Sequence, residues 1–315
     1  MTIDEIYTKV QEYLKKPPLV IWGSGATAGF GLPSMGMLKD EIGNVLPSFD
    51  KSCTDLEAEL GKEKYETDLP QIRKIIRKAV GERDLVAKKD FLKNEHEFDG
   101  IRRLTSFCHE PHPKVMNVIS TNYDLILEYA WGYYGVPFTD GFGQQELSEF
   151  NENRFKESDM VNLMKVHGSL NWFEIHNEVR KLSTDFGYDP VMVPPGKNKY
   201  RTTHLSPYRE LLQKADDAIK KANSFLVVGF GFNDEHITPL VRKQTSKGTP
   251  IVVVTMNITG ATFKELENAK KVIYIEAGAD KTKSRIRIIE NGSIVSDSVE
   301  DDNYWTLNKF MDMVQ

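Results

Sequence analysis

Residues 20–33 read Val-Ile-Trp-Gly-Ser-Gly-Ala-Thr-Ala-Gly-Phe-Gly-Leu-Pro, a short apolar run that leads into a glycine-rich turn. In α/β proteins, a strand followed by such a turn places the backbone N–H groups of the next helix against a phosphate. The spacing from Gly23 is G-x-G-x-x-x-G, which differs by one residue from the common dinucleotide-binding fingerprint. The stretch alone leaves two interpretations open, a nucleotide-binding turn and a structural link between a strand and a helix.

The composition of the 315-residue chain, 40% hydrophobic and 28% charged, is ordinary for a folded soluble protein. Its net charge of -5 gives no general attraction for a nucleic-acid backbone, so direct nucleic-acid binding is not expected. No apolar run approaches the roughly 20 residues that span a bilayer, and no secretory leader pattern is present, so we expect a cytoplasmic protein with no membrane partner. The two cysteines, Cys53 and Cys108, argue against a disulfide framework and exclude a four-cysteine zinc site.

The pattern of apolar residues predicts an alternation of strands and helices. Short apolar runs flanked by turn residues predict buried strands at 19–22, 115–119, 163–166, 225–228, 251–254 and 272–275. Apolar residues at helical spacing predict helices that include 3–14, 35–46, 206–222 and 304–314. Hairpins are expected at 172–182 and, from an Asn-Gly turn, at 286–295. This order predicts an α/β fold with a Rossmann-like, doubly wound, mostly parallel sheet.

Residues 48–113 lack a convincing strand and are dense in charged residues, with apolar residues at helical spacing. We therefore expect a helical insertion at 48–113 in a sheet domain formed by 1–47 and 114–315. The basic cluster within residues 73–78 is interpreted as a solvated helix face, because Glu82 and Asp84 follow it. The Cys-His-Glu-Pro-His run at 108–112 has no second pair of ligands, and no metal site is predicted there.

Four of the predicted strands end in polar or glycine-rich turns. These turns are Gly23–Gly31, Thr121–Asp124, His167-Gly168 and Gly229–Asp234. In an open parallel sheet, ligands bind at the carboxyl ends of the strands, where such turns meet. The sequence therefore predicts one ligand site to which all four turns contribute.

Together the turns resemble the motifs of the sirtuin superfamily, and within it the SIR2-like NADases of prokaryotic antiphage defence systems more than the protein deacylases. The glycine segment is similar to the first motif, residues 121–124 resemble the Gln-Asn-x-Asp motif, and His167-Gly168 resembles the catalytic His-Gly. Val228–Asp234 looks like the glycine strand-turn of these NADases, and Asn257 resembles the asparagine that contacts the adenosine ribose. The order of the motifs, from about residue 19 to 257, is more specific than any one of them.

The resemblance implies an NAD+ glycohydrolase that converts NAD to nicotinamide and ADP-ribose, depletes NAD during infection, and needs no metal. It implies catalytic roles for Asn122, which orients the ribose hydroxyls or a water, Asp124, which binds the carboxamide, and His167, the general base. The residues expected to bind NAD are Gly23, Ser24, Gly25, Ala26, Thr27, Gly31, Pro33, Gly229, Gly231 and Asn257. Backbone N–H groups of residues 23–27 would hold the pyrophosphate. A homo-oligomer, a co-encoded defence partner, or both are expected to trigger activity.

Two departures from the deacylase pattern bear on the reaction. Ser34-Met35-Gly36 stands where deacylases carry Asp-Phe-Arg, and the zinc cysteines are missing. Both put lysine deacylation in doubt. Two alternatives to NAD hydrolysis remain open, namely NAD-dependent deacylation or ADP-ribosyl transfer, and a non-catalytic module that senses NAD or ADP-ribose.

Each candidate residue also has a structural interpretation. Asn122 is a common turn residue, Asp124 suits the first turn of a helix, and His167 is compatible with a hydrogen-bonded core histidine. Their occurrence together with the glycine turn favours the catalytic interpretation. For Asp234 and Glu235 we expect helix capping and solvation rather than catalysis.

Overall fold

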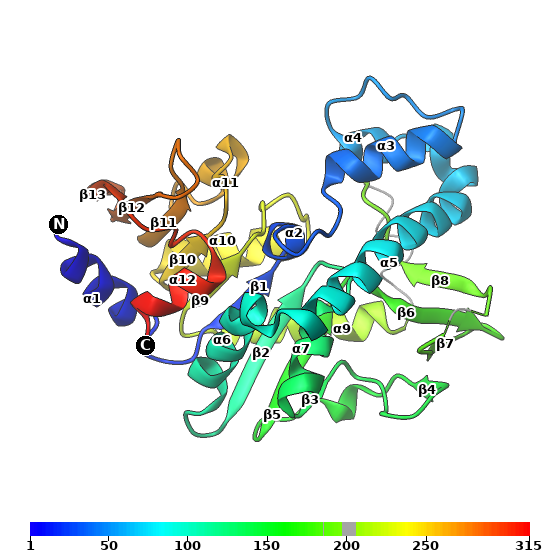
Figure 1. Ribbon diagram of the computed structural model, residues 1–315, viewed down its shortest axis with the longest axis horizontal. Coiled ribbons are helices and arrows are strands. Elements are labelled where there is room, and N and C mark those ends of the chain that lie inside the picture. Colours follow the sequence, from blue (N-terminus) through cyan, green and yellow to red (C-terminus); the bar gives the residue numbers. More distant parts are fainter. Residues whose placement is uncertain (185, 197–205) are drawn as a thin grey trace.

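A nine-stranded sheet forms the centre of the computed structural model, which describes residues 1–184, 186–196 and 206–315 (Figure 1). The strand order is β13-β12-β11-β10-β9-β1-β2-β5-β3. The strands are β1 (Leu19–Trp22), β2 (Val115–Ser120), β3 (Phe138–Thr139), β5 (Met160–Lys165), β9 (Phe225–Val228), β10 (Ile251–Val254), β11 (Lys271–Ala277), β12 (Ser284–Glu290) and β13 (Ser293–Glu300). Neighbouring strands from β11 to β3 pair in parallel, whereas β12 pairs antiparallel with both β11 and β13. The predicted mostly parallel α/β sheet is therefore confirmed.

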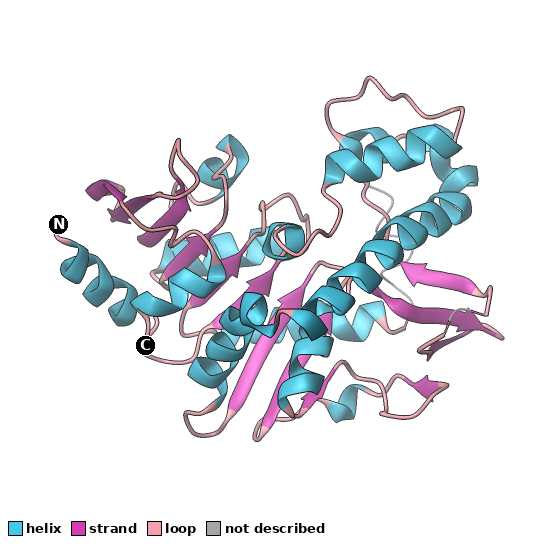
Figure 2. Ribbon diagram, viewed as in Figure 1, coloured by secondary structure: helices cyan, strands magenta, loops and turns pink. Residues whose placement is uncertain are grey.

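Helices cover both faces of this sheet (Figure 2). Every residue of β1, β9 and β10 is buried, because parallel strands between two helical layers have no face toward water. One face packs against α1 (Ile3–Tyr13), α6 (Asp99–His109), α7 (Ile126–Tyr134) and α12 (Leu307–Phe310). The other packs against α9 (Tyr208–Lys221), α10 (Ile237–Lys247) and α11 (Gly260–Glu265).

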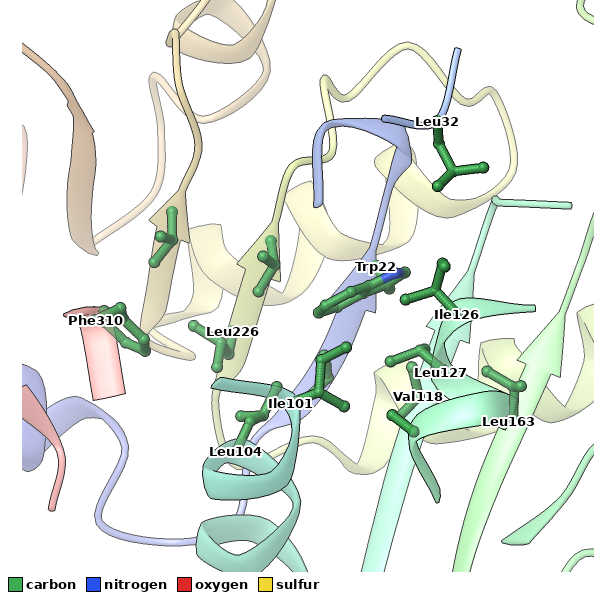
Figure 3. Close-up of a cluster of buried hydrophobic side chains, with 14 of the residues drawn as sticks. Trp22, Leu32, Ile101, Leu104, Val118, Ile126, Leu127, Leu163, Leu226 and Phe310 are labelled. Atoms are coloured by element: carbon green, nitrogen blue, oxygen red, sulfur yellow. The ribbon is translucent and has the colours of Figure 1, made fainter. Parts of the chain in front are cut away.

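The side chains of β1 alternate between the two cores. Val20 and Trp22 belong to the core on one face, and Leu19 and Ile21 to the core on the other. Figure 3 shows Trp22 among side chains of the first core from the neighbouring strands and from α6 and α7. This alternation fixes the register of β1 and hence the position of the glycine turn that follows it.

Residues 48–113 are all described and none of them is in a strand, in agreement with the sequence-based expectation of helices. They form α4 (Leu56–Leu60), α5 (Leu69–Lys93) and α6, with short 3-10 turns between them. The α6 helix packs on β2 and α7, so it is part of the layer over the sheet, whereas α5 also contacts α3 (Met35–Val45). The division into a sheet domain and an insertion stays a prediction.

A second, four-stranded sheet has the order β4-β7-β6-β8. Its strands are β4 (Ser148–Glu149), β6 (Gly168–Ile175), β7 (Glu178–Lys181) and β8 (Asp189–Met192). The β6–β7 and β12–β13 hairpins confirm the two predicted hairpins. We did not predict β4, which is too short to show a pattern, or β8, which contains a proline. Among the described residues, no helix has the length and apolar character needed to cross a membrane.

Candidate functional site

The four turns predicted to meet do so around one cavity of about 190 Å³ at the carboxyl ends of β1, β2, β5 and β9. The strand ends contribute Thr121, Asn122, Tyr123, Asp124, His167, Gly229, Phe230, Gly231, Asn233 and Asp234. The glycine segment and the helices above it contribute Ser24, Thr27, Leu32, Pro33, Met35, Leu38, Glu57 and Val80, and Pro195 completes the wall. The cavity therefore lies where an open α/β sheet binds its ligands.

The glycine turn after β1 interlocks with the turn after β9. The Gly23 N–H donates to Val228 O at 3.0 Å, and the Gly25 N–H donates to Gly229 O at 2.9 Å. Gly229 has a φ of +61°, and a Cβ there would collide with the Ala26 backbone nitrogen. Close backbone approach therefore explains these glycines. The Ala26 N–H donates to Gly23 O at 3.0 Å, so phosphate binding by the N–H groups of residues 23, 25 and 26 stays a prediction.

Only some of the other residues expected to bind NAD line the cavity. Ser24, Thr27, Pro33, Gly229 and Gly231 line the cavity. Gly31 and Asn257 are exposed and are outside its lining. Gly25, Ala26 and Gly229 also border a second hollow, together with Val254, Thr255 and Met256 at the end of β10. This hollow adjoins the cavity across Gly229.

Hydrogen bonds fix the orientation of the Asn122 side chain, which is only 6% exposed. Its Nδ2 donates to Gly23 O at 3.1 Å and to Thr27 Oγ1 at 3.2 Å. This assigns the amide nitrogen to the glycine turn and leaves Oδ1 as the acceptor. Among the residues that the structure describes, none donates to this buried Oδ1. A ligand hydroxyl is the kind of group that would satisfy it.

Asp124 is buried beside Asn122 and shares Thr27 with it. Thr27 Oγ1 donates to Asp124 Oδ2 at 3.1 Å, and Asp124 Oδ1 accepts the Ile126 N–H at 3.3 Å at the start of α7. Burial raises the pKa of the Asp124 carboxyl from 3.8 to about 6, although the nearby Lys165 cation opposes the shift. Asp124 therefore changes charge in a pH range where few carboxyl groups do.

His167 is paired with Asp234, a contact that sequence reasoning missed. His167 Nε2 lies 2.8 Å from Asp234 Oδ2, and the side chains are 13% and 3% exposed. Asp234 Oδ1 accepts the N–H groups of His236 and Ile237 at 2.9 and 2.8 Å, so the expected helix capping is also present. Gly168 follows with a φ of +86°, and a Cβ there would collide with Val191 O, so His167 requires glycine next to it.

A second ionisable pair is sealed behind the residue 121–125 loop. Lys165, at the end of β5, is 1% exposed, and its Nζ donates to Glu128 Oε1 at 2.7 Å and to Asp124 O at 2.6 Å. Burial raises the pKa of the Glu128 carboxyl. Neither residue lines the cavity, so the pair supports the loop rather than contacting a ligand. Within the described part of the chain, no three His, Cys, Asp or Glu residues are placed to hold a metal ion.

Comparison with known proteins places the chain in a family. No curated protein sequence matches the chain significantly. Among solved structures, the chain is similar to a Sir2 enzyme described for its mechanism and regulation, with 15% identity, a TM-score of 0.46, and 82% of this chain and 89% of that chain covered. A Sir2 homolog–NAD complex has 16% identity, a TM-score of 0.44, and coverage of 82% and 84%. A Sir2 protein bound to a propionylated peptide has 13% identity, a TM-score of 0.45, and coverage of 82% and 89%. Residues 116–273, half of the chain, match the SIR2-like domain, and the chain therefore belongs to the SIR2-like family.

Proposed function

We propose that this protein is an NAD+ glycohydrolase that uses water to break the bond between nicotinamide and ribose. The observation that carries the proposal is the meeting of Asn122, Asp124 and the His167–Asp234 pair in one cavity at the carboxyl edge of the sheet. Membership of the SIR2-like family supports NAD as the substrate. The solved structure of a Sir2 homolog–NAD complex is consistent with the same choice.

The size of the cavity suits one end of a dinucleotide. Its volume of about 190 Å³ is below the roughly 300–1,000 Å³ of pockets that enclose a whole drug-sized ligand. We infer that the nicotinamide and its ribose occupy this cavity, and that the rest of the molecule extends across Gly229 into the hollow bordered by Thr255. Ser24 and Thr27, which line the cavity at the start of α2 (Ser24–Ala28), are the candidates for contact with the pyrophosphate.

The residues present suit a reaction in which the leaving group needs no proton. The electron pair of the broken C1′–N bond stays on the nicotinamide ring, which departs as a neutral molecule while positive charge develops on the ribose. The ionised Asp124 carboxylate would accept a hydrogen bond from the carboxamide. Asn122 Oδ1 would accept one from a ribose hydroxyl or from the attacking water. Both groups position the reactants rather than transfer protons.

His167 is the group that can take the proton of the attacking water. Because Nε2–H donates to Asp234, the neutral ring keeps Nδ1 as its acceptor. As the water oxygen bonds to C1′, one water proton passes to His167 and later to solvent. The products are nicotinamide, ADP-ribose and a proton. General bases of this kind contribute about 10²–10⁴-fold to a rate.

The proposal includes a biological setting. By the resemblance described above, the protein acts in the cytoplasm as the NAD-depleting effector of an antiphage defence system, triggered by self-assembly or by a co-encoded partner. Ser34-Met35-Gly36 and the count of only two cysteines in the chain favour this activity over lysine deacylation. A cyclic form of ADP-ribose is a possible product of the same cleavage.

The experiment is to incubate the purified protein with NAD, alone and with its co-encoded neighbour, and to quantify nicotinamide and ADP-ribose by chromatography. We expect nicotinamide release, and we expect Asn122→Ala to reduce it about 100-fold because the reactants lose their orientation. Asn268→Ala, at an exposed asparagine outside the cavity lining, is the matched control. Cleavage by Asn122→Ala at the wild-type rate would show that the site is wrongly assigned. NAD consumption only in the presence of an acylated peptide would identify a deacylase instead, and binding without turnover would identify a sensor.

A further inference from the structure

The long α5 helix carries a buried carboxylate that the sequence pattern placed on a solvated face. In the basic cluster on α5, Lys74 and Lys78 are exposed as predicted, whereas Arg73 and Arg77 are half-buried. Asp84, which served as an indication of that solvated face, is itself only 3% exposed. A buried carboxylate on a helix is costly unless it has partners. Its partners lie where the loop that carries Asn122 and Asp124 leads into α7.

Asp84 accepts two hydrogen bonds from the start of α7. Its Oδ1 accepts the Leu125 N–H at 2.8 Å, and its Oδ2 accepts the Tyr129 hydroxyl at 2.9 Å. Leu125 is the N-cap of α7 and directly follows Asp124. The N–H groups at a helix start have no acceptor within their own helix, and a buried one that is left unbonded costs about 1–3 kcal/mol. Asp84 therefore fixes the point where the loop becomes a helix.

Lys165 holds the same loop from the opposite direction. Its Nζ donates to the carbonyl oxygen of Asp124, the residue before Leu125, and pairs with Glu128 on α7. The peptide group between Asp124 and Leu125 is thus held at both ends. Lys165 on β5 binds its carbonyl oxygen, and Asp84 on α5 binds its N–H. Since Asp84 does not line the cavity, its influence on a ligand must pass through this loop.

We propose that Asp84 is a positioning residue for NAD cleavage, which holds Asn122 and Asp124 at the cavity through its hydrogen bonds to Leu125 and Tyr129. The inference rests on the proposed function. It assigns to the helical segment 48–113 an indirect part in the chemistry, because this segment supplies the carboxylate that holds the loop. Displacement of α5 would then impair cleavage because it would shift the loop that carries Asn122 and Asp124.

The charge of Asp84 provides a readout that a purely structural role would not affect. Burial is the main cause of the raised pKa of Asp124, and the charged groups around it act in both directions. Lys165 on β5 lowers this pKa, whereas Glu128 on α7 and Asp84 on α5 raise it. The neighbouring Tyr129 is held neutral, because burial and Asp84 raise the pKa of its hydroxyl. Removal of the Asp84 charge should therefore lower the pKa of Asp124.

Two substitutions separate position from charge. Asp84→Asn keeps an oxygen that can accept the Leu125 N–H but removes the charge. Asp84→Ala removes both. We expect Asp84→Ala to lower kcat for nicotinamide release about 10–100-fold with KM changed less than about 2-fold, because misplacement of reacting groups by ångströms has costs of this order. For Asp84→Asn we expect most of kcat to be retained and the acid limb of the pH profile to move to lower pH. Glu82→Gln, at an exposed position on the same helix, should match the wild type.

The Asp124 carboxyl is also titrated directly by carbon NMR in the wild type and in Asp84→Asn, with Asp124→Asn used to assign the signal. This measurement does not require turnover. If the wild type cleaves no NAD, the proposed function fails, while an Asp124 pKa that is lower in Asp84→Asn still supports the contact. If the wild type is active, equal kcat in Asp84→Ala and Glu82→Gln overturns the positioning role. An unchanged Asp124 pKa in Asp84→Asn overturns it as well, and decides the question if Asp84→Ala does not fold.

Discussion

The His167–Asp234 and Lys165–Glu128 pairs begin two residues apart at the end of β5, yet they differ in what they can reach. Both join a basic side chain to a carboxylate that is at most 10% exposed, at 2.7–2.8 Å. His167 lines the cavity with its side chain 13% exposed, whereas Lys165 is 1% exposed and contacts the backbone of the loop. A pair that borders the cavity can exchange a proton with a reactant, and a sealed pair can only stabilise structure. Substitutions in the two pairs should therefore change different properties.

The largest expected effect is on stability and follows removal of the sealed cation. Lys165→Met leaves the Glu128 carboxylate buried without its partner and frees the Asp124 carbonyl. Loss of one member of a buried ion pair costs about 3–5 kcal/mol in unfolding free energy. Urea denaturation followed by circular dichroism measures this. The double variant Lys165→Met/Glu128→Leu should recover part of the loss, because no unpaired charge remains. If the single variant is as stable as the wild type, the sealed pair is not what holds the loop.

A smaller change, in the activation free energy of cleavage rather than in stability, is expected when the His167–Asp234 pair is altered. Asp234→Asn can still cap α10 through its oxygen, so the unfolding free energy should change by less than about 1 kcal/mol. The amide cannot accept from His167 Nε2–H while its oxygen caps the helix. The tautomer that leaves Nδ1 free as the base is then no longer favoured, and kcat should fall about 10–100-fold, which is less than the roughly 10²–10⁴-fold that a general base contributes in full.

Single-turnover nicotinamide release, measured beside KM and thermal stability, separates these effects. A fall in stability that accompanies the fall in kcat would show that Asp234 acts mainly as the cap of α10. Loss of kcat at unchanged stability supports the comparison between the two pairs. Asp189→Asn, at an exposed aspartate on β8 outside the cavity lining, is the matched control.

The difference between the pairs also marks the limit of the sequence analysis. Asn122, Asp124 and His167 could be brought together in advance, because each follows an apolar strand and the carboxyl ends of parallel strands meet at one edge. The partnership of His167 with Asp234 joins residues 67 positions apart and leaves no local pattern. The burial of Asp84 has no local pattern for a related reason, since a charged residue after a basic cluster looks the same in sequence whether or not a distant loop covers it.

Backbone geometry sets a second limit. The glycine turn was recognised as a feature of the site, but its spacing does not show that the N–H groups of Gly23 and Gly25 donate to the turn after β9. That depends on the place of β9 beside β1, which is set by the order of strands in the sheet. Asn257 follows a correctly predicted strand, and its exposed position outside the cavity lining could not be read from the strand alone.

Asp124 borders the cavity and also contacts Lys165 through its carbonyl oxygen, and the sign of the stability change on its substitution distinguishes a functional from a structural role. Its pKa of about 6 exceeds the ordinary 3.8, so the folded state binds this proton more tightly than the unfolded state. The unfolding free energy therefore falls as the pH rises from about 4 through 6, and stays lower above that range.

Asp124→Asn removes this ionisation, and Thr27 can accept a hydrogen bond from the amide that replaces the carboxylate. We expect the variant to lose nicotinamide release yet to gain about 1–3 kcal/mol of stability at pH 8, with little gain at pH 4. Urea denaturation of both proteins at pH 4 and pH 8 measures this. If the variant is less stable than the wild type at pH 8, the Asp124 carboxylate stabilises the loop, as Lys165 does, and does not lower the stability of the folded protein.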